Sequence, residues 1–412
     1  MKLPRLLSVL LLLALVLTLV PAPVARAEDA AAAYEPVLSA LRAAAAETEP
    51  DPFAYEDSFS YLFFMPYVQA VPGALLTDLN GDGVPELLLG NASPDAGQYG
   101  PVYFYDLYAL VDGVPKHVVS SGERYRYYLR SDGLIAYEGS SGAAYSYVAL
   151  YRFGGIGLRC LRMLLTDENG CYTAESETYD SSYAQAIDWD TWNTLADECR
   201  SNLITAPPFT PLDREPMPLD VSAAAHPEDA VWQNVAAQYR RALAEPWIYR
   251  AAEMPDVHGE LLYDSLLEPG ELEGTPALRW QLLDLNRDGT DELLLTRAML
   301  GDYGEVLEET AYELFVAKDG KAWPLFQLQV GPRWGSRLVP TRDGHLWLTQ
   351  ADRQLEIYHL DENARLVCDG VYTPDDSLEY GAHYRDAAGN QLSAYELWES
   401  MGGSALTGGQ DF

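Results

Sequence analysis

Two short acidic stretches are the residues of this chain whose types and spacing could hold a metal ion. One reads DLNGDGVPE over residues 78–86 (loop one), and the other reads DLNRDGTDE over residues 284–292 (loop two). Carboxylates placed this close together repel one another unless a positive charge lies between them. Oxygen ligands on alternate residues, with a glycine at position six, allow a short loop to wrap a hard cation such as calcium. Positions one, three, five, seven and nine are Asp78, Asn80, Asp82, Val84 and Glu86 in loop one, and Asp284, Asn286, Asp288, Thr290 and Glu292 in loop two.

The alternative to a calcium site is a hairpin turn that is polar but binds no ion. The two loops agree at all four oxygen-bearing side chains, whereas Gly81 is replaced by Arg287 and Val84 by Thr290. Because the shared side chains are those that a cation needs, the pattern favours calcium. For loops in extracellular proteins, the expected dissociation constant is about 10⁻⁴ to 10⁻³ M.

The loops do not fit the EF-hand, the best-known calcium loop. An EF-hand requires a glutamate at position twelve and a helix on each side of the loop. Leu89 and Leu295 occupy position twelve, and leucine-rich stretches flank both loops. This pattern favours a strand, a loop and a second strand.

A loop with an acidic residue at position nine and a strand after it resembles the calcium loops of FG-GAP and VCBS-type β repeats. The resemblance implies that calcium is bound by the side chains at positions one, three, five and nine, with the backbone at position seven. Those residues are Asp78, Asn80, Asp82, Glu86 and Val84, and Asp284, Asn286, Asp288, Glu292 and Thr290. Glutamate at position nine and Arg287 at position four depart from the usual pattern.

The rest of the chain is similar to uncharacterised secreted tandem-repeat proteins of Gram-positive bacteria. The shared pattern is an amphipathic helix, the acidic loop, a Y-D-L-Y hairpin and an R-x-Y-Y-L hairpin, and it covers most of both halves. Only the acidic loop is a specific motif. The resemblance implies no enzymatic activity.

The order of motifs predicts that the chain contains two copies of one domain. YFYDLYALVDG (103–113) matches TAYELFVAKDG (310–320), and VALYRFGGIGLRCL (148–161) matches LEIYHLDENARLVC (355–368). Alternating β-branched and aromatic residues separated by Asp-Gly pairs predict hairpins at 112–113, 132–133, 319–320 and 343–344. The predicted fold is α+β, with two tandem copies that each contain an N-terminal helix, an antiparallel β meander with a calcium loop, and a short C-terminal helix.

Helical spacing supports this arrangement. Tyr34, Val37, Leu38 and Leu41 begin the first half, whereas Val231, Val235 and Tyr239 follow His226-Pro227 in the second. Short closing helices are predicted at 190–200 and 393–401, with Asp190 and Ser393 as N-caps. The predicted boundaries are a signal peptide at 1–27, a first domain at 28–204, a Pro-rich linker or edge strand at 205–226, a second domain at 227–403 and a disordered tail at 404–412.

Composition limits the partners that the protein can have. The basic start, the short apolar run and the Ala-Arg-Ala at 25–27 predict a secretory signal peptide, with an uncleaved anchor as the alternative. A net charge of −35 disfavours nucleic acid and anionic lipid. The expected location is therefore secreted or cell-surface, with no membrane association after cleavage.

The four cysteines form no disulfide framework, so buried thiols and a single bridge in the first half both stay open.

Motifs for catalysis are scarce. No H-E-x-x-H, G-x-S-x-G or phosphate-binding glycine loop occurs. The pair Asp188 and Asp190 beside Trp189 could serve a glycosidase, but helix capping explains it more simply. The sequence therefore predicts a non-enzymatic calcium-binding protein. The alternatives are an extracellular glycan- or protein-binding module that uses a Tyr-rich sheet face, and a carboxylate-dependent hydrolase. The tyrosines at issue are Tyr103, Tyr105, Tyr108, Tyr125, Tyr127, Tyr128, Tyr145, Tyr147 and Tyr151.

Overall fold

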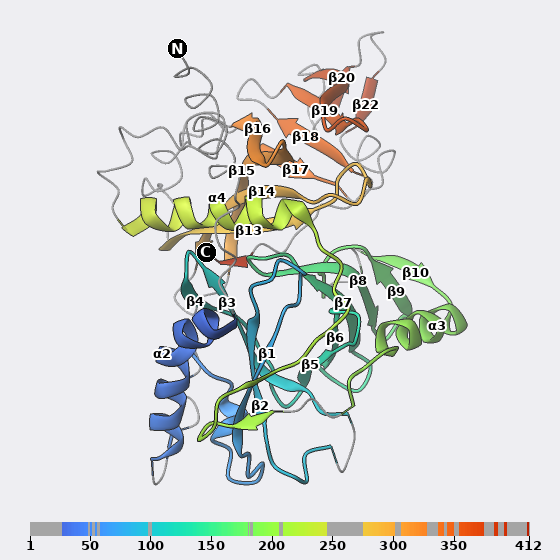
Figure 1. The fold of residues 1–412 in the computed structure, drawn as a ribbon. Helices are drawn as coiled ribbons and strands as arrows, with labels where there is room; N and C mark the ends of the chain where they lie inside the picture. Colours follow the sequence, from blue (N-terminus) through green and yellow to red (C-terminus); the bar gives the residue numbers. More distant parts are fainter. Residues whose placement is uncertain are drawn as a thin grey trace, which may run out of the picture.

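A computed structural model shows a mixed α+β protein made mostly of antiparallel sheets (Figure 1). The part of the chain that it describes contains three α-helices, namely α2 (Ala27–Ala45), α3 (Trp189–Arg200) and α4 (Pro227–Ala244). The described residues are 27–47, 50–51, 54–55, 58–97, 101–179, 181, 184–205, 209–244, 275–300, 306–327, 337–341, 344–349, 354–374, 383–385, 391–393 and 410–411.

The first sheet has twelve strands within the described residues, in the order β10-β9-β8-β7-β6-β5-β3-β2-β1-β11, with β4 on β3 and β12 on β1. Neighbouring strands run antiparallel, except for β12 against β1. The strands are β1 (Pro72–Thr77), β2 (Glu86–Asn91), β3 (Phe104–Val111), β4 (Val114–Ser120), β5 (Tyr125–Leu129), β6 (Ile135–Ser140), β7 (Ser146–Phe153), β8 (Leu158–Thr166), β9 (Cys171–Ala174), β10 (Gln185–Ile187), β11 (Thr210–Pro211) and β12 (Met217–Pro218). A short 3-10 helix, η1 (Tyr61–Phe63), precedes them.

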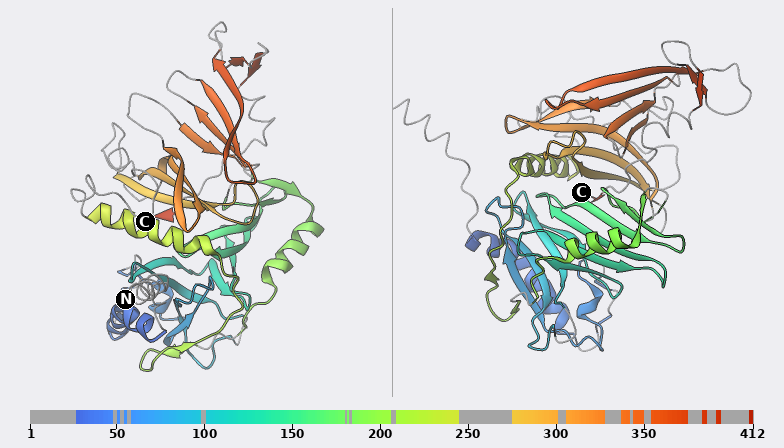
Figure 2. Two further views of the ribbon diagram at one scale, coloured as in Figure 1. Left: turned by 45° about the horizontal axis from the view of Figure 1, so that its top comes forward. Right: turned by 90° about the vertical axis from the view of Figure 1, so that its right-hand side faces the viewer.

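The second sheet has eleven strands in the described residues, in the order β22-β21-β20-β19-β18-β17-β15-β14-β13-β23, with β16 on β15. Figure 2 shows this sheet and the first on opposite sides of α4. The strands are β13 (Thr275–Leu283), β14 (Glu292–Leu300), β15 (Val306–Lys318), β16 (Lys321–Gln327), β17 (Arg337–Pro340), β18 (His345–Thr349), β19 (Leu355–Leu360), β20 (Leu366–Pro374), β21 (His383–Arg385), β22 (Gln391–Ser393) and β23 (Gln410–Asp411).

The Asp-Gly pairs make the tight turns that the sequence predicts. Asp112 and Gly113 join β3 to β4 with φ angles of 55° and 71°, and Asp319 and Gly320 join β15 to β16 with 54° and 70°. Positive φ at both central residues is the geometry of a type I′ hairpin. Gly133 also has a positive φ, between β5 and β6. Residue 343 of the fourth pair lies outside the described residues.

Both predicted N-terminal helices form, and each buries the face that its apolar spacing indicates. Tyr34, Leu38 and Leu41 of α2 are buried against the first sheet. Val231, Val235 and Tyr239 of α4 are buried against the second sheet, beside Trp280, Leu293 and Phe315. Residues spaced by three or four positions lie on one side of a helix, which is why this spacing predicts the buried face.

Helix α4 also joins the two halves. It packs on β15 and β16 of the second sheet and on β3 of the first, and Figure 1 shows it lying between the sheets. Val111 and Ile156 from the first half belong to the same buried cluster as Trp280 from the second. Because a hydrophobic core crosses the boundary, the structure does not divide into clear tandem copies.

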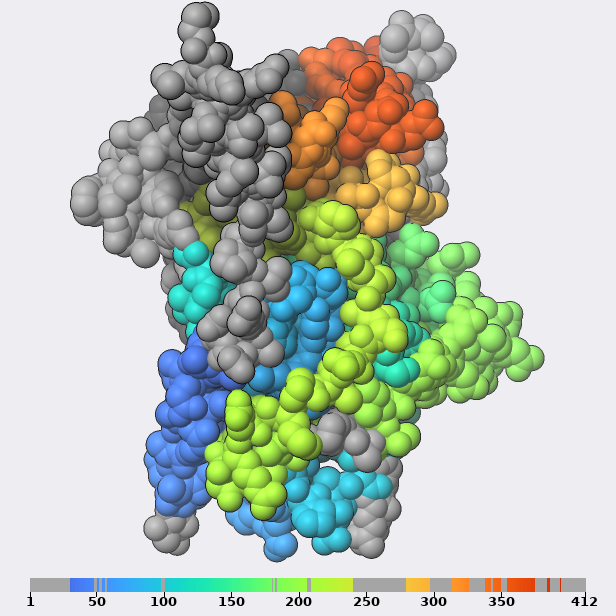
Figure 3. All heavy atoms as spheres, viewed as in Figure 1, coloured from blue at the N-terminus to red at the C-terminus, as the bar shows by residue number. Residues whose placement is uncertain are grey.

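The predicted linker lies on the first sheet. Thr210–Pro211 and Met217–Pro218 pair with β1, and Figure 3 shows this segment running over the surface towards α4. These pairings correspond to the edge-strand alternative for 205–226. The last described residues, Gln410–Asp411, pair with β13, in contrast to the disordered tail predicted for 404–412. The signal-peptide prediction falls almost wholly on residues outside the described part, and no described helix is long and apolar enough to span a membrane.

Helix α3 begins two residues earlier than the sequence pattern suggests. Its N-cap is Asp188, whose side chain accepts a hydrogen bond of 2.8 Å from the Thr191 amide, so the prediction of Asp190 is wrong. Asp190 lies in the first turn, where its charge faces the positive end of the helix dipole. Ser393, predicted to cap the second closing helix, ends β22, and residues 394–401 lie outside the described residues.

The cap gives a direct test. Asp188→Ala should lower the free energy of unfolding by about 1 kcal/mol, because the Thr191 amide loses its acceptor. Asp190→Ala is the matched control and should cost at most about half as much, since it removes only an exposed charge near the dipole. Urea unfolding of both variants measures the difference, and equal losses would contradict the assignment of Asp188 as the cap.

Candidate metal-binding loops

Each acidic loop joins two strands that are paired with each other near one edge of their sheet. Loop one connects β1 to β2, where Thr77 pairs with Glu86. Loop two connects β13 to β14, where Leu283 pairs with Glu292. The strand, loop and strand arrangement predicted from the sequence is therefore confirmed, and the EF-hand alternative is excluded because no helix flanks either loop.

In loop one, the acidic side chains accept hydrogen bonds from the loop's own backbone. The two carboxylate oxygens of Asp78 accept from the amides of Gly81 (2.7 Å) and Gly83 (2.8 Å). Asp82 accepts from the Val84 amide at 2.7 Å, and the side-chain oxygen of Asn80 accepts from the Asp82 amide at 3.3 Å. The chain therefore wraps around the Asp78 carboxylate. Positive φ angles of 71° at Gly81 and 85° at Gly83 allow it to turn so tightly.

Loop two repeats most of this arrangement, although its sequence differs from that of loop one at positions four, seven and eight. Asp284 accepts from the amides of Asp288 (3.0 Å) and Gly289 (3.1 Å), and Asp288 accepts from the Thr290 amide (2.7 Å). Arg287 has a φ of 60°, the conformation that Gly81 takes in loop one. A side chain at this φ is strained, so loop two keeps the shape of loop one at some energetic cost.

The glutamate at position nine is buried in both loops. Glu86 and Glu292 are each 2% exposed, and each accepts a 2.8 Å hydrogen bond from the amide of the residue at position two. Burial, together with the nearby Asp82 and Asp78 charges, raises the pKa of Glu86 well above its usual range. Burial and the neighbouring aspartates likewise raise the pKa of Glu292 to about 8. In both cases burial is the largest cause, because a buried carboxyl favours its neutral form.

The loops offer oxygen donors of the kind that suit a hard cation, but not a cage of carboxylates alone. Among the described residues, no group of three or more His, Cys, Asp or Glu side chains is arranged to hold a metal ion. A cation in loop one would therefore need the Asn80 side chain and the Val84 carbonyl oxygen beside the carboxylates. The same holds for Asn286 and Thr290 in loop two.

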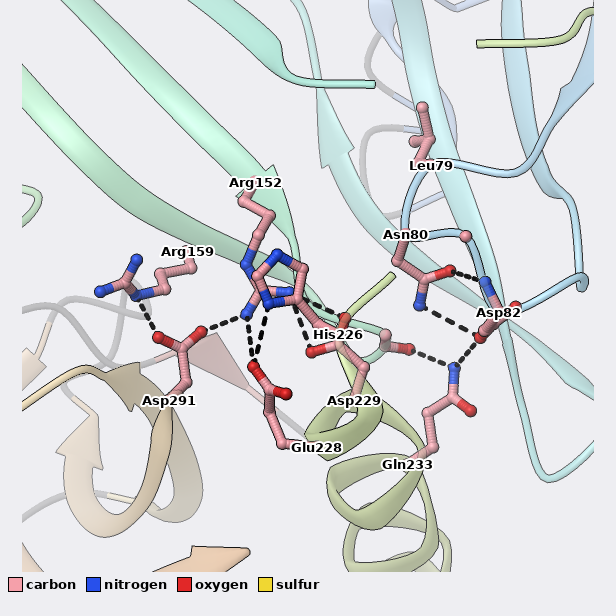
Figure 4. A network of polar contacts seen from close by, with 12 residues as sticks. Leu79, Asn80, Asp82, Arg152, Arg159, His226, Glu228, Asp229, Gln233 and Asp291 are labelled. Atoms are coloured by element: carbon pink, nitrogen blue, oxygen red, sulfur yellow. Dashed lines mark hydrogen bonds and ion pairs between the residues drawn. The ribbon is translucent and has the colours of Figure 1, made fainter. Parts of the chain in front are cut away.

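A buried ionic network joins loop two to the first sheet, and sequence reasoning missed it. Arg152 of β7 donates to Asp229 at the start of α4, at 2.8 and 3.0 Å, and to Asp291 of loop two. The Arg159 side chain of β8 also contacts Asp291, at 2.6 Å. Arg152, Asp229 and Asp291 are each at most 6% exposed. Figure 4 shows these four side chains, from β7, β8, the start of α4 and loop two, close together.

Loop one reaches the same helix through a neutral side chain. The Gln233 amide of α4 donates to Asp82 at 3.0 Å and to the Gly155 carbonyl at 3.3 Å (Figure 4). Gln233 lies four residues after Asp229, so the two side chains lie on the same face of α4. One signal for the network was present in the sequence, since loop two has the extra acid Asp291 where loop one has Pro85.

A serine, a histidine and an aspartate also meet in the first half, but not as a catalytic triad. His117 uses one ring nitrogen, Nε2, for both Ser120 Oγ (3.0 Å) and Asp106 (3.2 Å). In a triad the histidine takes the serine proton on one nitrogen while the aspartate orients the other. Asp106 is fully buried and also accepts from the Ser60 amide. This cluster thus ties η1 to β3 and β4.

The remaining candidates from the sequence have structural roles. Six of the nine tyrosines named above are buried, and Tyr125 and Tyr145 are exposed, so most of them pack in the core of the first half. The carboxylate of Asp188 is engaged in helix capping. All four cysteines are free thiols. In the second sheet, His359 contacts Asp369 at 2.8 Å, with His345 at 3.7 Å from the same carboxylate.

No family model matches the chain, and no curated protein matches it.

Proposed function

We propose that this is a secreted, non-enzymatic protein in which loops one and two bind calcium and thereby stabilise the start of each sheet. The observation that carries the proposal is the shared geometry of the two loops. Both wrap the backbone around the aspartate at position one and bury the glutamate at position nine. A merely polar turn has no reason to bury a carboxylate beside two others, because burial without a partner is costly.

Calcium is the ion that this donor set suits. Every side-chain donor is an oxygen, which favours a hard cation over zinc or copper. A divalent ion would offset the mutual repulsion of Asp78, Asp82 and Glu86. It would also relieve the burial of Glu86, since an opposite charge nearby favours the ionised form. Magnesium demands a more regular octahedral shell and gives up water reluctantly, so a loop with backbone and side-chain donors favours calcium.

The two halves are best explained as diverged copies of one domain. The strand order β9-β8-β7-β6-β5-β3-β2-β1 corresponds to β21-β20-β19-β18-β17-β15-β14-β13, and β16 lies on β15 as β4 lies on β3. Helix α2 precedes the strands of the first sheet in the chain, and helix α4 precedes those of the second. This correspondence supports duplication, followed by fusion of the copies through the core around α4.

The proposal is tested by thermal unfolding of the full chain in chelator, in calcium and in magnesium. At free calcium about ten times the dissociation constant, each site stabilises the protein by roughly 1.4 kcal/mol, so the unfolding temperature should rise. Asp78→Ala combined with Asp284→Ala should remove that rise. Asp112→Asn, in the exposed β3–β4 turn, is the control and should keep it. An unfolding temperature that calcium leaves unchanged at millimolar concentration would refute the proposal.

The two sites are expected to differ in affinity. The guanidinium of Arg159 lies 3.9 Å from Asp284 in loop two and supplies part of the positive charge that an ion would supply. No described Lys or Arg forms an ion pair with Asp78, Asp82 or Glu86 in loop one. Loop one should therefore bind calcium several-fold more tightly, since a local cation disfavours a second one.

The affinities can be separated by titrating Asp78→Ala, which leaves loop two, and Asp284→Ala, which leaves loop one. Arg159→Gln in the Asp78→Ala protein should strengthen the remaining site. Loop two could instead bind calcium as tightly as loop one, with a dissociation constant that Arg159→Gln does not change. That result would show that the guanidinium has no influence on calcium affinity.

A further inference from the structure

We propose that loops one and two are coupled through the first turns of α4, so that a change in one loop alters the other. The proposal rests on a continuous series of contacts from loop two to loop one. Loop two reaches Arg152 through Asp291, Arg152 reaches α4 through Asp229, and α4 reaches loop one through Gln233 and Asp82. Figure 4 shows the whole series in one view.

The ionic contacts in the series are costly to break. Arg152 is 6% exposed and lies between Asp229 and Asp291, which are 1% and 2% exposed. If loop two moved away, Arg152 would lose one of its three buried carboxylate partners, Asp229, Glu228 and Asp291. Removing one member of a buried ionic group leaves an uncompensated charge, which is far less stable than the complete group. Loop two and the start of α4 are therefore expected to move together.

The first turns of α4 pass such a movement to loop one. Asp229 and Gln233 are separated by one helical turn, and a helix moves as a rigid element over that length. Gln233 also donates to Gly155, in the turn between β7 and β8. Arg152 and Arg159 flank this turn, so the same piece of the first sheet touches both ends of the series. A shift of the helix would displace the Gln233 amide from Asp82, which is position five of loop one.

This coupling deepens the proposed function, and its consequence for calcium rests on that function. An ion bound at loop one would draw Asp82 towards itself and alter its contact with Gln233. Through α4, it would alter the support that Asp291 gives to loop two. Calcium at one loop would then change the stability of the other, and the two sites would not act as independent additions.

The linkage is tested first in chelator, by hydrogen exchange of the loop amides in the full chain. Asp291→Asn keeps the shape of the side chain but removes its charge. Exchange at the Gly81 and Gly83 amides of loop one should then accelerate by roughly tenfold, within the range for residues in one hydrogen-bonded network. Asp319→Asn is the matched control, because it makes the same substitution in an exposed turn of the second half. It should leave both loops unchanged.

A milder variant guards against a general loss of stability. Gln233→Ala removes the contact with Asp82 and should accelerate exchange at Gly289 and Thr290 of loop two, whereas Asn234→Ala, exposed on the same helix, should not. Core amides of β6 serve as the reference. If Asp291→Asn and Gln233→Ala each disturb only their own neighbourhood, or raise exchange in β6 as much as in the loops, the coupling is refuted.

Adding calcium to the Asp288→Ala protein then separates the two proposals. With loop two disabled, calcium should protect Gly81 and Gly83 directly and should also change exchange at Gly289 and Thr290. Protection confined to loop one would refute the coupling while supporting calcium binding. No protection at either loop, after a positive result in chelator, would refute calcium binding and leave the linkage standing.

Discussion

Arg152→Met is expected to lower the free energy of unfolding by about 3–5 kcal/mol, because it leaves buried carboxylates without their shared partner. Asp229 loses its guanidinium, and Asp291 retains only Arg159. The methionine can fill much of the volume, so the loss reports the charge rather than a cavity. Denaturant unfolding of the full chain, followed by both circular dichroism and tryptophan fluorescence, measures it.

Arg162→Met is the matched control for this prediction. Arg162 lies on β8 and pairs with Glu198 at 2.7 Å, but both side chains are at least a third exposed, so its loss should cost at most about 1 kcal/mol. Adding Asp229→Asn to Arg152→Met should recover part of the stability, because it removes one of the stranded charges. Similar losses for Arg152→Met and Arg162→Met, or no recovery in the double variant, would contradict a buried network.

The second large effect is a pH dependence of the free energy of unfolding, which calcium should reverse. Burial and the adjacent aspartates raise the pKa of Glu292 from 4.5 to about 8. A carboxyl whose folded-state pKa is raised stabilises the protein fully below its unfolded pKa, and this contribution is lost as the pH rises through the folded value. In chelator, stability should therefore fall between about pH 4.5 and pH 8. At roughly 1.4 kcal/mol per pKa unit, the fall amounts to several kcal/mol.

Glu292→Gln should reduce this loss of stability with rising pH, because the glutamine side chain is neutral at every pH. The remaining slope would come from other buried acids, among them Glu86, Asp291 and Asp229; burial raises the pKa of Asp229 to about 7. Since calcium requires the ionised carboxylate, its stabilising effect should grow over the same window. Unfolding measured from pH 5 to pH 8, with and without calcium, checks both statements. Stability that rises with pH in chelator would contradict the burial of these acids without a cation.

Local sequence patterns were enough to predict the elements that hold the loops. Helical spacing located the buried faces of α2 and α4, and the Asp-Gly pairs located the tight turns, because both signals depend only on neighbouring residues. The N-cap of α3 was misplaced because Asp188 and Asp190 are both good caps, and only the hydrogen bond to Thr191 distinguishes them. Similar letters can also mislead: NGCYTAE (169–175) resembles DGVYTPD (369–375), yet 171–174 form β9 whereas 371–374 belong to β20.

Long-range features could not be predicted in the same way. Arg152, Asp229 and Asp291 are far apart in the sequence, and nothing in their local context shows that they meet. The tyrosines illustrate the same limit. Alternation along a strand shows that its two faces differ, but not that helices and other strands cover both of them. The extra acid of loop two was the one visible trace of the interface, and it acquired meaning only once Arg152 was seen beside it.

The most direct measurement of the central claim is isothermal titration of the full chain with calcium at pH 8, where the loop carboxylates are most ionised. The account predicts two bound ions per chain, with dissociation constants of about 10⁻⁴ to 10⁻³ M. It also predicts one ion for Asp82→Ala, one for Asp288→Ala, and none when both substitutions are combined. A wild-type chain that takes up no calcium would contradict the account, as would a double variant that still binds two ions.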